Sequence, residues 1–144
     1  MWNQCDMRVL IVDDDERVRN ALSVYFDARD DFDLAGEASN GVEAVERCRQ
    51  LQPDVVLLDL NMPVMDGVAA TKRIHTEFPY LPVVILTNGL DMDRIHAALR
   101  AGASAYVIKS SNVDRLAETL RSSYRGQRPR LHVPKPILKL QTAC

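Results

Sequence analysis

The 144-residue sequence contains only three cysteines and has no long apolar segment. Cys5, Cys48 and Cys144 are widely separated and odd in number, which matches neither a disulfide framework nor a metal-binding spacing and favours a reducing compartment. The first residues, MWNQCDM, lack the apolar core of a signal peptide, and no apolar run is long enough to span a membrane. These absences predict a cytoplasmic protein that does not contact a membrane.

The sequence also lacks a strong excess of either charge, since its formal net charge is −2. This balance argues against binding of nucleic acid over the whole surface. The charge is nevertheless uneven, because no Asp or Glu follows Glu118. The basic residues beyond that point are Arg121, Arg125, Arg128, Arg130, Lys135 and Lys139. No aromatic residue is interleaved among those from 125 onward, so we do not expect this tail to contact nucleic acid directly.

The length of the chain predicts one domain, and neither an internal repeat nor a low-complexity segment divides it. Pro129, Pro134 and Pro136 stand among the basic residues near the C-terminus. We therefore predict a domain over residues 1–124 and a basic, proline-containing linker or tail over residues 125–144. Residues 136–140 could begin a short helix in this tail.

Short apolar runs alternate with stretches of helical periodicity. Residues 9–12, 55–58, 83–86 and 105–108 are typical of buried strands, and the more polar residues 32–38 predict a strand at a sheet edge. Apolar residues at helical spacing follow each strand, within residues 18–25, 44–51, 66–76, 92–99 and 113–124. Gln52-Pro53 ends the second helix, and Gly102 is expected to cap the fourth. The pattern predicts an α/β fold in which helices cover both faces of a parallel sheet through right-handed crossovers.

Side chains that can take part in binding or catalysis stand directly after four of the predicted strands. Asp13 and Asp14 follow the first strand, Asp59 the third, Thr87 the fourth and Lys109 the fifth. The carboxyl ends of parallel strands meet at one edge of the sheet, where open α/β sheets bind ligands. Converging carboxylates repel one another, and Mg²⁺ is a natural compensation because it prefers oxygen ligands. A carboxylate can attack phosphorus, while a metal, an ammonium and a hydroxyl can stabilise phosphoryl oxygens.

Simpler structural roles account for other acidic residues nearby. Asp15 and Glu16 are typical of a helix N-terminus, where the helix dipole favours acids. Asp66 lies just before the third helical pattern and is a natural N-cap. Asp59 is left without such a role, which favours a chemical one. Thr87 alone would fit a solvated loop, so it is the combination of strand ends that indicates a site.

Four segments of the sequence, VDDD, VVLLDLNMPVMDG, VVILTNG and AYVIKS, resemble the receiver domain of two-component response regulators in motif, order and spacing. The resemblance implies a flavodoxin-like (βα)5 three-layer sandwich with a parallel five-stranded sheet of order 2-1-3-4-5. It also implies a signalling protein rather than an enzyme. Such a protein accepts a phosphoryl group from a sensor histidine kinase and assists only its own phosphotransfer and dephosphorylation.

The same resemblance implies Mg²⁺ as the cofactor and assigns its ligands. Asp14 binds the metal directly and Asp13 assists through water. Asp59 supplies a carboxylate oxygen, and Asn61 supplies its backbone carbonyl.

The resemblance further implies that Asp59 is the phosphoacceptor, that Thr87 bonds the phosphoryl group and that Lys109 neutralises it. Phosphorylation adds roughly one negative charge and several acceptor oxygens. Thr87 then moves towards these oxygens, and Tyr106, in the position of the family's aromatic switch residue, fills the vacated space. The surface formed by the fourth helix, the fifth strand and the fifth helix changes as the two populations shift. Without the resemblance, Tyr106 would be interpreted as a partly exposed strand residue.

Two positions depart from the family pattern. Asn88 stands where the family most often has alanine, and Ser110 stands where it usually has proline after a cis peptide bond. A cis bond without proline costs about 3 kcal/mol, which leaves the isomer of the Lys109–Ser110 bond open. We also hypothesise that Gly89 leaves the phosphoryl group open to attacking water.

The segment from Arg125 onward resembles the linker of response regulators that continue into a LuxR-type helix-turn-helix domain, and the sequence does not contain that domain. We therefore expect control of transcription through a DNA-binding domain outside this sequence, or a stand-alone receiver that acts by protein contact. The sequence does not decide whether the protein forms a homodimer.

A second class of function is a small phosphatase. Asp13 and Asp15 form an Asp-x-Asp pair after a strand, which resembles the haloacid-dehalogenase phosphatases. In that interpretation Asp13 is the nucleophile and Asp15 the acid/base. Those enzymes need a later acidic pair and usually a cap insertion, neither of which is visible, and Asp59 would have no role.

Overall fold

The computed structural model describes residues 6–127 and shows strands and helices in strict alternation. The strands are β1 (Met7–Val12), β2 (Phe32–Ala38), β3 (Val55–Asp59), β4 (Val83–Thr87) and β5 (Ala105–Ile108). The helices are α1 (Glu16–Asp27), α2 (Gly41–Leu51), α3 (Gly67–Glu77), α4 (Met92–Arg100) and α5 (Val113–Gln127). All neighbouring strands pair in parallel in the order β2-β1-β3-β4-β5. The predicted flavodoxin-like fold is therefore confirmed.

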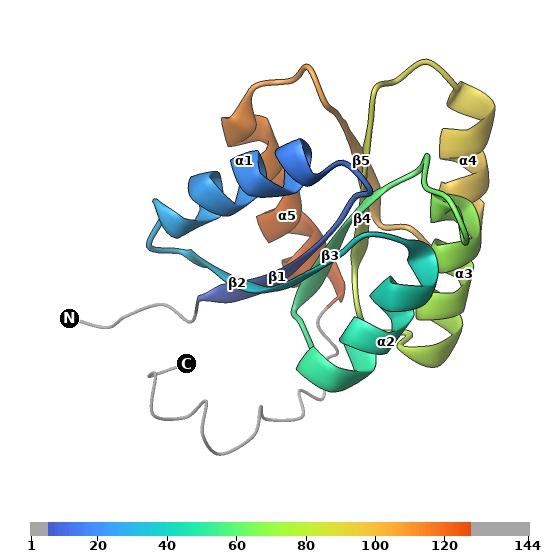
Figure 1. Ribbon diagram of the computed structural model, residues 1–144, viewed down its shortest axis with the longest axis horizontal. Coiled ribbons are helices and arrows are strands. Elements are labelled where there is room, and N and C mark those ends of the chain that lie inside the picture. The colour runs from blue at the N-terminus through green and yellow to red at the C-terminus, as the bar shows by residue number, and fades with distance from the viewer. Residues whose placement is uncertain (1–5, 128–144) are drawn as a thin grey trace.

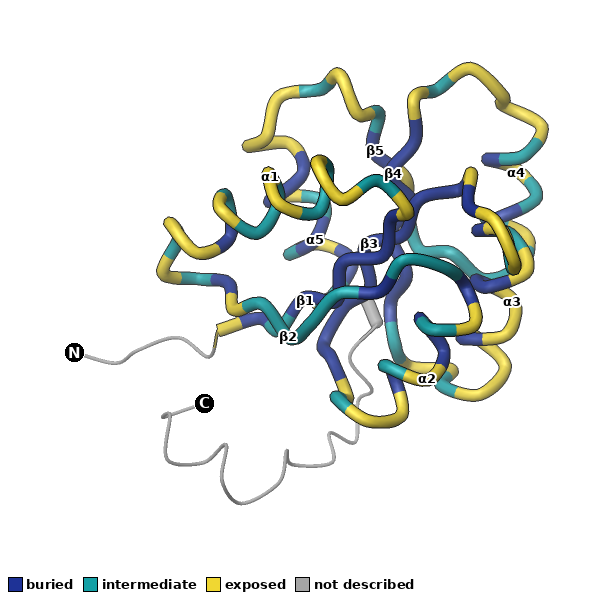
Figure 2. Tube along the Cα trace, in the orientation of Figure 1, coloured by how far each residue is buried: buried dark blue, intermediate teal, exposed yellow. Residues whose placement is uncertain are grey.

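The sheet lies between two layers of helices, with α1 and α5 on one face and α2, α3 and α4 on the other (Figure 1). Successive strand residues point to opposite faces, so one short apolar run supplies both halves of the core. In β3, Val56 and Leu58 join the cluster beneath α2, α3 and α4, while Val55 and Leu57 join the cluster beneath α1 and α5. Strands β3 and β4 are buried along their length (Figure 2).

The helix starts agree with the predicted caps. Asp15 is the N-cap of α1, and its side chain accepts a hydrogen bond from the backbone N–H of Arg17. Asp66 is the N-cap of α3 and accepts from the N–H of Ala69. Asp15 and Asp66 therefore have structural roles as helix caps, whereas Asp13 and Asp59, at the ends of β1 and β3, cap neither of these helices.

The C-terminal ends of α4 and α5 bear on two further expectations. Helix α4 ends at Arg100 with Ala101 as its C-cap residue, and Gly102, expected at this cap, follows directly with φ +122°. Helix α5 continues to Gln127, so residues 125–127, which were assigned to the linker, are helical, and the first helix-breaking residue, Pro129, comes only after them. The rest of the predicted tail, residues 128–144 with the expected helix at 136–140, lies outside the described residues, as do Cys5 and Cys144.

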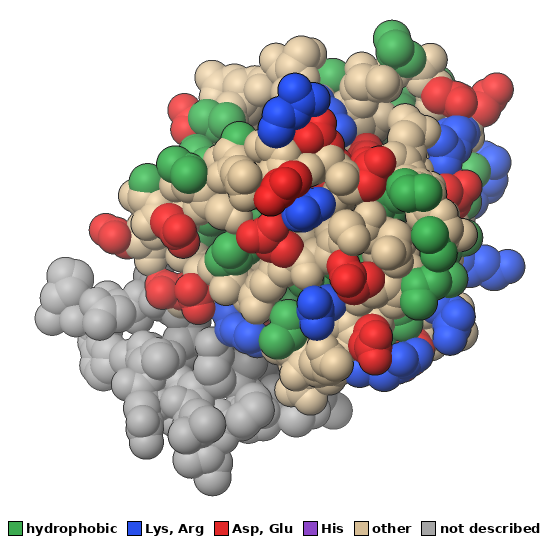
Figure 3. Space-filling model, viewed as in Figure 1, with side chains coloured by type: hydrophobic (Ala, Val, Ile, Leu, Met, Phe, Trp, Pro, Cys, Tyr) green, Lys and Arg blue, Asp and Glu red, His purple; other side chains and the backbone are tan. Residues whose placement is uncertain are grey.

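The surface carries both signs of charge. Acidic and basic side chains are interspersed over the face shown in Figure 3, in keeping with the near-neutral formal net charge of −2. Among the helices of residues 6–127, none has the length and apolar character needed to cross a membrane.

Candidate functional site

The sheet brings the predicted site residues to one edge. Leu58 pairs with Val12 on one side, Asp59 pairs with Leu86 on the other, and Thr87 pairs with Ile108. The residues at the carboxyl ends of neighbouring strands therefore lie beside one another. This register places Asp13, Asp59, Thr87 and Lys109 along a single line of adjacent strand ends.

Three carboxylates converge at this edge. Asp13, Asp14 and Asp59 each offer an oxygen, and these oxygens all lie within 4.8 Å of one another. Asp13 and Asp59 are buried, whereas Asp14 is exposed at the mouth of the site. The predicted acidic cluster is thus present, with two inner carboxylates and one that faces solvent.

Lys109 supplies a positive charge to the two inner carboxylates. Its Nζ lies 3.3 Å from Oδ2 of Asp13 and 3.5 Å from Oδ1 of Asp59. Burial lowers the pKa of Lys109, but the carboxylates of Asp59 and Asp13 outweigh this effect and the pKa is raised. Lys109 is therefore a charged ammonium at neutral pH.

The ionisation of Asp59 is disfavoured by its surroundings. Burial raises its pKa to about 6, and the negative charge of Asp13 adds to this shift. The ammonium of Lys109 and a hydrogen bond from the backbone of Asn61 oppose the shift without cancelling it. One ammonium does not balance the negative charge of the three carboxylates, so an additional cation would reduce their repulsion.

The two oxygens of Asp13 differ in their partners, and one of them indicates where such a cation fits. Oδ1 of Asp13 accepts a hydrogen bond of 2.9 Å from the N–H of Asp15. Oδ2 is buried and accepts no hydrogen bond from residues 6–127, although it lies near the ammonium of Lys109. Buried polar atoms are normally satisfied, and a carboxylate oxygen beside two further carboxylates suits Mg²⁺. The donor set therefore fits the predicted metal.

Thr87 lies at the site but is bonded within its own loop. Its hydroxyl is buried and accepts a hydrogen bond of 3.2 Å from the N–H of Gly89. The N–H of Lys109 donates to the carbonyl of Thr87 at 2.6 Å, which ties the ends of β4 and β5 together. The Lys109–Ser110 bond is trans.

Tyr106 is not part of the site in this structure. It lies in β5 with 39% of its surface exposed. The predicted switch pair of Thr87 and Tyr106 is therefore seen with the hydroxyl held by the β4–α4 loop and the aromatic ring at the surface.

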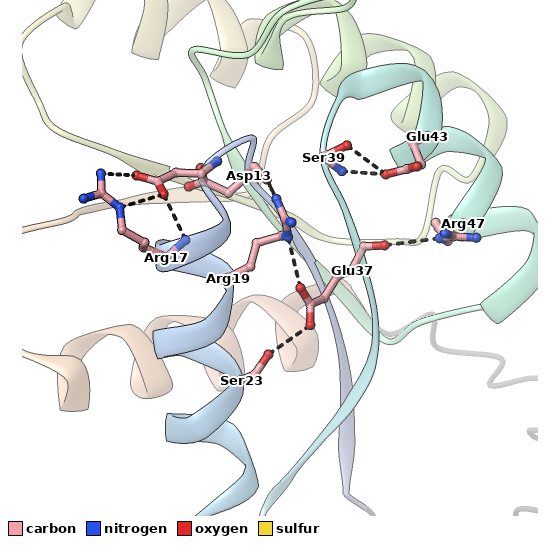
Figure 4. Close-up of polar contacts among 9 residues, drawn as sticks. Asp13, Arg17, Arg19, Ser23, Glu37, Ser39, Glu43 and Arg47 are labelled. Atoms are coloured by element: carbon pink, nitrogen blue, oxygen red, sulfur yellow. Dashed lines mark hydrogen bonds and ion pairs between the residues drawn. The ribbon is translucent and has the colours of Figure 1, made fainter.

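Two arginines contact the site loops, and neither was predicted from the sequence. Arg19 in α1 donates to the carbonyl of Asp13 at 2.7 Å and to Glu37 at 3.0 Å. Glu37 in turn accepts from Ser23, and its carbonyl accepts from Arg47, so α1, β2 and α2 are joined behind Asp13 (Figure 4).

The second arginine, Arg94 in α4, donates to the side chain of Asn61 and to the carbonyl of Leu60. Arg94 lies far from Asn61 in the sequence and within a helix rich in charged residues. No local pattern marks it, and only the packing of α4 against α3 brings it to the β3–α3 loop.

The phosphatase interpretation meets an obstacle in Asp15. Its carboxylate caps α1 and lies 3.4 Å from the guanidinium of Arg17. Hydrogen bonds from the Arg17 side chain and backbone lower the pKa of Asp15. A carboxylate held ionised at a helix cap is poorly suited to act as a general acid. Asp59, which has no role in the phosphatase interpretation, lies within the cluster of carboxylates.

Comparisons with known proteins agree with this geometry. Residues 9–121 match the response regulator receiver domain family. The transcriptional regulatory protein LiaR of Bacillus subtilis is 39% identical over 121 residues, which are 84% of this chain and 57% of LiaR. The response regulator protein VraR of Staphylococcus saprophyticus is 36% identical over 84% of this chain and 58% of VraR. This chain thus spans less than two thirds of these relatives.

Solved structures show the same architecture. The crystal structure of a LuxR-family two-component response regulator from Aurantimonas sp. SI85-9A1 aligns with a TM-score of 0.79 at 27% identity. The alignment covers 95% of this chain and 94% of that one.

Proposed function

The chain belongs to the response regulator receiver family, and we propose that its Asp59 accepts a phosphoryl group from a sensor histidine kinase. The observation that carries this proposal is the position of Asp59, buried at the end of β3 and within ion-pair distance of Lys109 beside two further carboxylates. A carboxylate oxygen of Asp59 attacks phosphorus and forms an acyl phosphate. The bond between phosphorus and the donor histidine breaks and its electron pair stays on the ring nitrogen, so that the imidazole, which carries a proton on its other nitrogen, leaves as a neutral ring.

Mg²⁺ is the proposed cofactor. Asp14 and Asp59 would bind it through carboxylate oxygens, Asp13 through water, and Asn61 through its backbone carbonyl. When bound, the metal supplies positive charge to the phosphoryl oxygens. It would also favour the ionised form of Asp59, which is the only form of the carboxyl group that can attack phosphorus.

The protein groups around Asp59 complete the charge balance. Lys109 is already charged and directed at Asp59, so its ammonium can follow the developing charge without rearrangement of the fold. These residues assist transfer to and from the chain's own carboxylate, which is the role of a signalling receiver and not of an enzyme that turns over a separate substrate.

The proposed switch begins at Thr87. Its hydroxyl oxygen accepts a hydrogen bond from the N–H of Gly89 in this structure, and a phosphoryl oxygen would accept one from its O–H. When Thr87 turns towards them, Tyr106 can leave the surface and occupy the vacated space. Both arrangements exist beforehand, and phosphorylation shifts their populations.

The output proposed is control of transcription. LiaR is named a transcriptional regulatory protein, and this chain aligns with a little more than half of it. We propose that a DNA-binding domain linked to the receiver reads the switch. A receiver that acts alone through protein contact is the second candidate.

Labelling with a small phosphodonor tests the proposal. The chain is incubated with phosphoramidate and Mg²⁺, and intact-protein mass spectrometry should show the addition of one phosphoryl group. Asp59→Asn should abolish the addition, and borohydride trapping should place it on residue 59. Label on Asp13 with continuous release of phosphate would instead support the phosphatase interpretation.

A further inference from the structure

Arg94, in the first turn of α4, spans the loop between β3 and α3. Its Nη1 donates to Oδ1 of Asn61, and its Nη2 donates to the carbonyl of Leu60 at 3.0 Å. Its Nη2 also lies 3.2 Å from Oδ2 of Asp66, the N-cap of α3. A single guanidinium therefore contacts the first residues of the loop and its last one.

These contacts suit arginine in particular. The guanidinium presents its donors in a rigid planar fork, so it can serve a carbonyl, an amide oxygen and a carboxylate at once. The side chain of Arg94 is 29% exposed, which means that most of it is held against the protein. The carbonyl of Leu60 also accepts from the N–H of Gly67 at 2.9 Å, so both ends of the loop are tied to one oxygen.

We propose that Arg94 is a positioning residue that couples helix α4 to the Mg²⁺ site by holding the backbone at Leu60 and Asn61. The inference rests on the proposed function, because that function identifies the cation. Asn61 would bind the metal through its backbone carbonyl, and a loop that is already ordered loses less entropy when the metal binds. Groups that orient metal ligands affect metal affinity in this way without touching the metal.

The same contacts link the metal to the proposed output surface. Arg94 is anchored on α4, which directly follows the loop that holds Thr87 and Gly89. A displacement of α4 would therefore strain or release the contacts with Leu60 and Asn61. Because coupling between two equilibria is reciprocal, metal binding should in turn restrain the start of α4.

Mg²⁺ titration of the full chain by calorimetry provides the first test. Arg94→Ala should weaken Mg²⁺ binding about 10-fold, and Arg94→Lys, which keeps the charge but not the fork, should give an intermediate loss. Arg100→Ala is the matched control. Arg100 lies in the same helix, is exposed and has no side-chain hydrogen bond or ion pair to any residue of the described chain, so its loss should leave the affinity unchanged.

Hydrogen–deuterium exchange gives a readout that does not depend on phosphorylation. In metal-free protein, peptides covering residues 60–67 should exchange faster in Arg94→Ala than in wild type or Arg100→Ala. Mg²⁺ should slow exchange in residues 92–100 of the wild type and of Arg100→Ala but not of Arg94→Ala. An arginine that only stabilised the fold would not remove this dependence on the metal.

Unchanged Mg²⁺ affinity together with unchanged exchange at residues 60–67 in Arg94→Ala would overturn the inference and leave the proposed function standing. Failure of the proposed function has a different appearance. In that case the wild type and all three variants alike would fail to bind Mg²⁺, and the metal part of this inference would fall with it.

Discussion

The ammonium of Lys109 lies 3.5 Å from Oδ1 of Asp59, although Asp59 ends β3, Lys109 directly follows β5, and β4 lies between these two strands. The side chain of Lys109 reaches across the end of β4, and the hydrogen bond from its N–H to the carbonyl of Thr87 fixes where it starts. Lys109 thus contacts both buried carboxylates of the site, because the same ammonium lies 3.3 Å from Oδ2 of Asp13.

Removal of the ammonium should impair phosphorylation. Lys109→Ala is expected to slow labelling by phosphoramidate about 100-fold, which is typical for loss of one group that stabilises developing charge. The measurement is the initial rate of mass gain at saturating Mg²⁺. Lys72→Ala, which removes an exposed lysine from α3, is the matched control. An equal rate in the two variants would show that Lys109 does not act on the phosphoryl group.

Asp59 should destabilise the metal-free fold at neutral pH. Its pKa is raised from 3.8 to about 6, so between these values the folded chain holds a proton that the unfolded chain has lost. The free energy of unfolding therefore falls as the pH rises through this window. A shift of this size corresponds to about 2–3 kcal/mol, an upper bound for a coupled cluster.

Asp59→Asn removes this effect and should be more stable than wild type at pH 7 but not at pH 4. Urea denaturation with a chelator present measures the difference, and Asp33→Asn on the edge strand β2 serves as an exposed control. A variant that is no more stable than wild type at pH 7 would contradict the raised pKa of Asp59.

Mg²⁺ should stabilise the fold through Asp13. A ligand at a hundred times its Kd adds about 2.7 kcal/mol to the free energy of unfolding. Asp13→Asn should lose most of that gain, because it removes the charge of one of the three carboxylates that converge at the proposed site. Asp15→Asn tests specificity, since asparagine also caps helices well and should keep the gain. Thermal unfolding with and without Mg²⁺ makes the comparison, and equal responses of the two variants would argue against a metal at Asp13.

Access of water at Gly89 should set the lifetime of the phosphorylated form. A larger side chain there should shield the phosphoryl group and slow its loss. Gly89 has φ +82°, and a Cβ would lie 2.7 Å from Cδ1 of Ile108. Gly89→Asn is therefore the preferred variant, because asparagine tolerates this backbone conformation better than most residues, and Ile108→Val can relieve the contact.

The decay of the phosphorylated form after removal of the donor measures the effect. Ile108→Val alone is the control for the packing change. Decay as fast as in the wild type would show that Gly89 does not govern the approach of water.

Local patterns in the chain were sufficient to predict the sheet and the composition of the site. Apolar runs such as residues 55–58 can be buried on both faces only in a covered parallel sheet, and β3 is buried throughout. Parallel strands all end at one edge, so Asp13, Asp59, Thr87 and Lys109 were expected at that edge, and the strand order that makes them neighbours was implied by the resemblance to receiver domains. Asp15 and Asp66 were separable from this group because helix caps follow a local rule.

Other features depend on contacts between segments that are remote in sequence. The exposure of Tyr106 and the burial of Oδ2 of Asp13 each depend on how several elements pack together. Arg19 and Arg94 reach the site from α1 and α4, and nothing in their immediate sequence distinguishes them from solvated arginines.

The amino-acid sequence by itself thus determined the order of the strands and helices and which functional groups stand at the strand ends, because hydrophobic periodicity and capping are local properties of the chain. Only the tertiary structure decided how close those groups come, which of them is hard to ionise and which arginines hold their loops. Distances, burial and pKa arise from the packing of helices against the sheet, and no single segment of the chain contains that information.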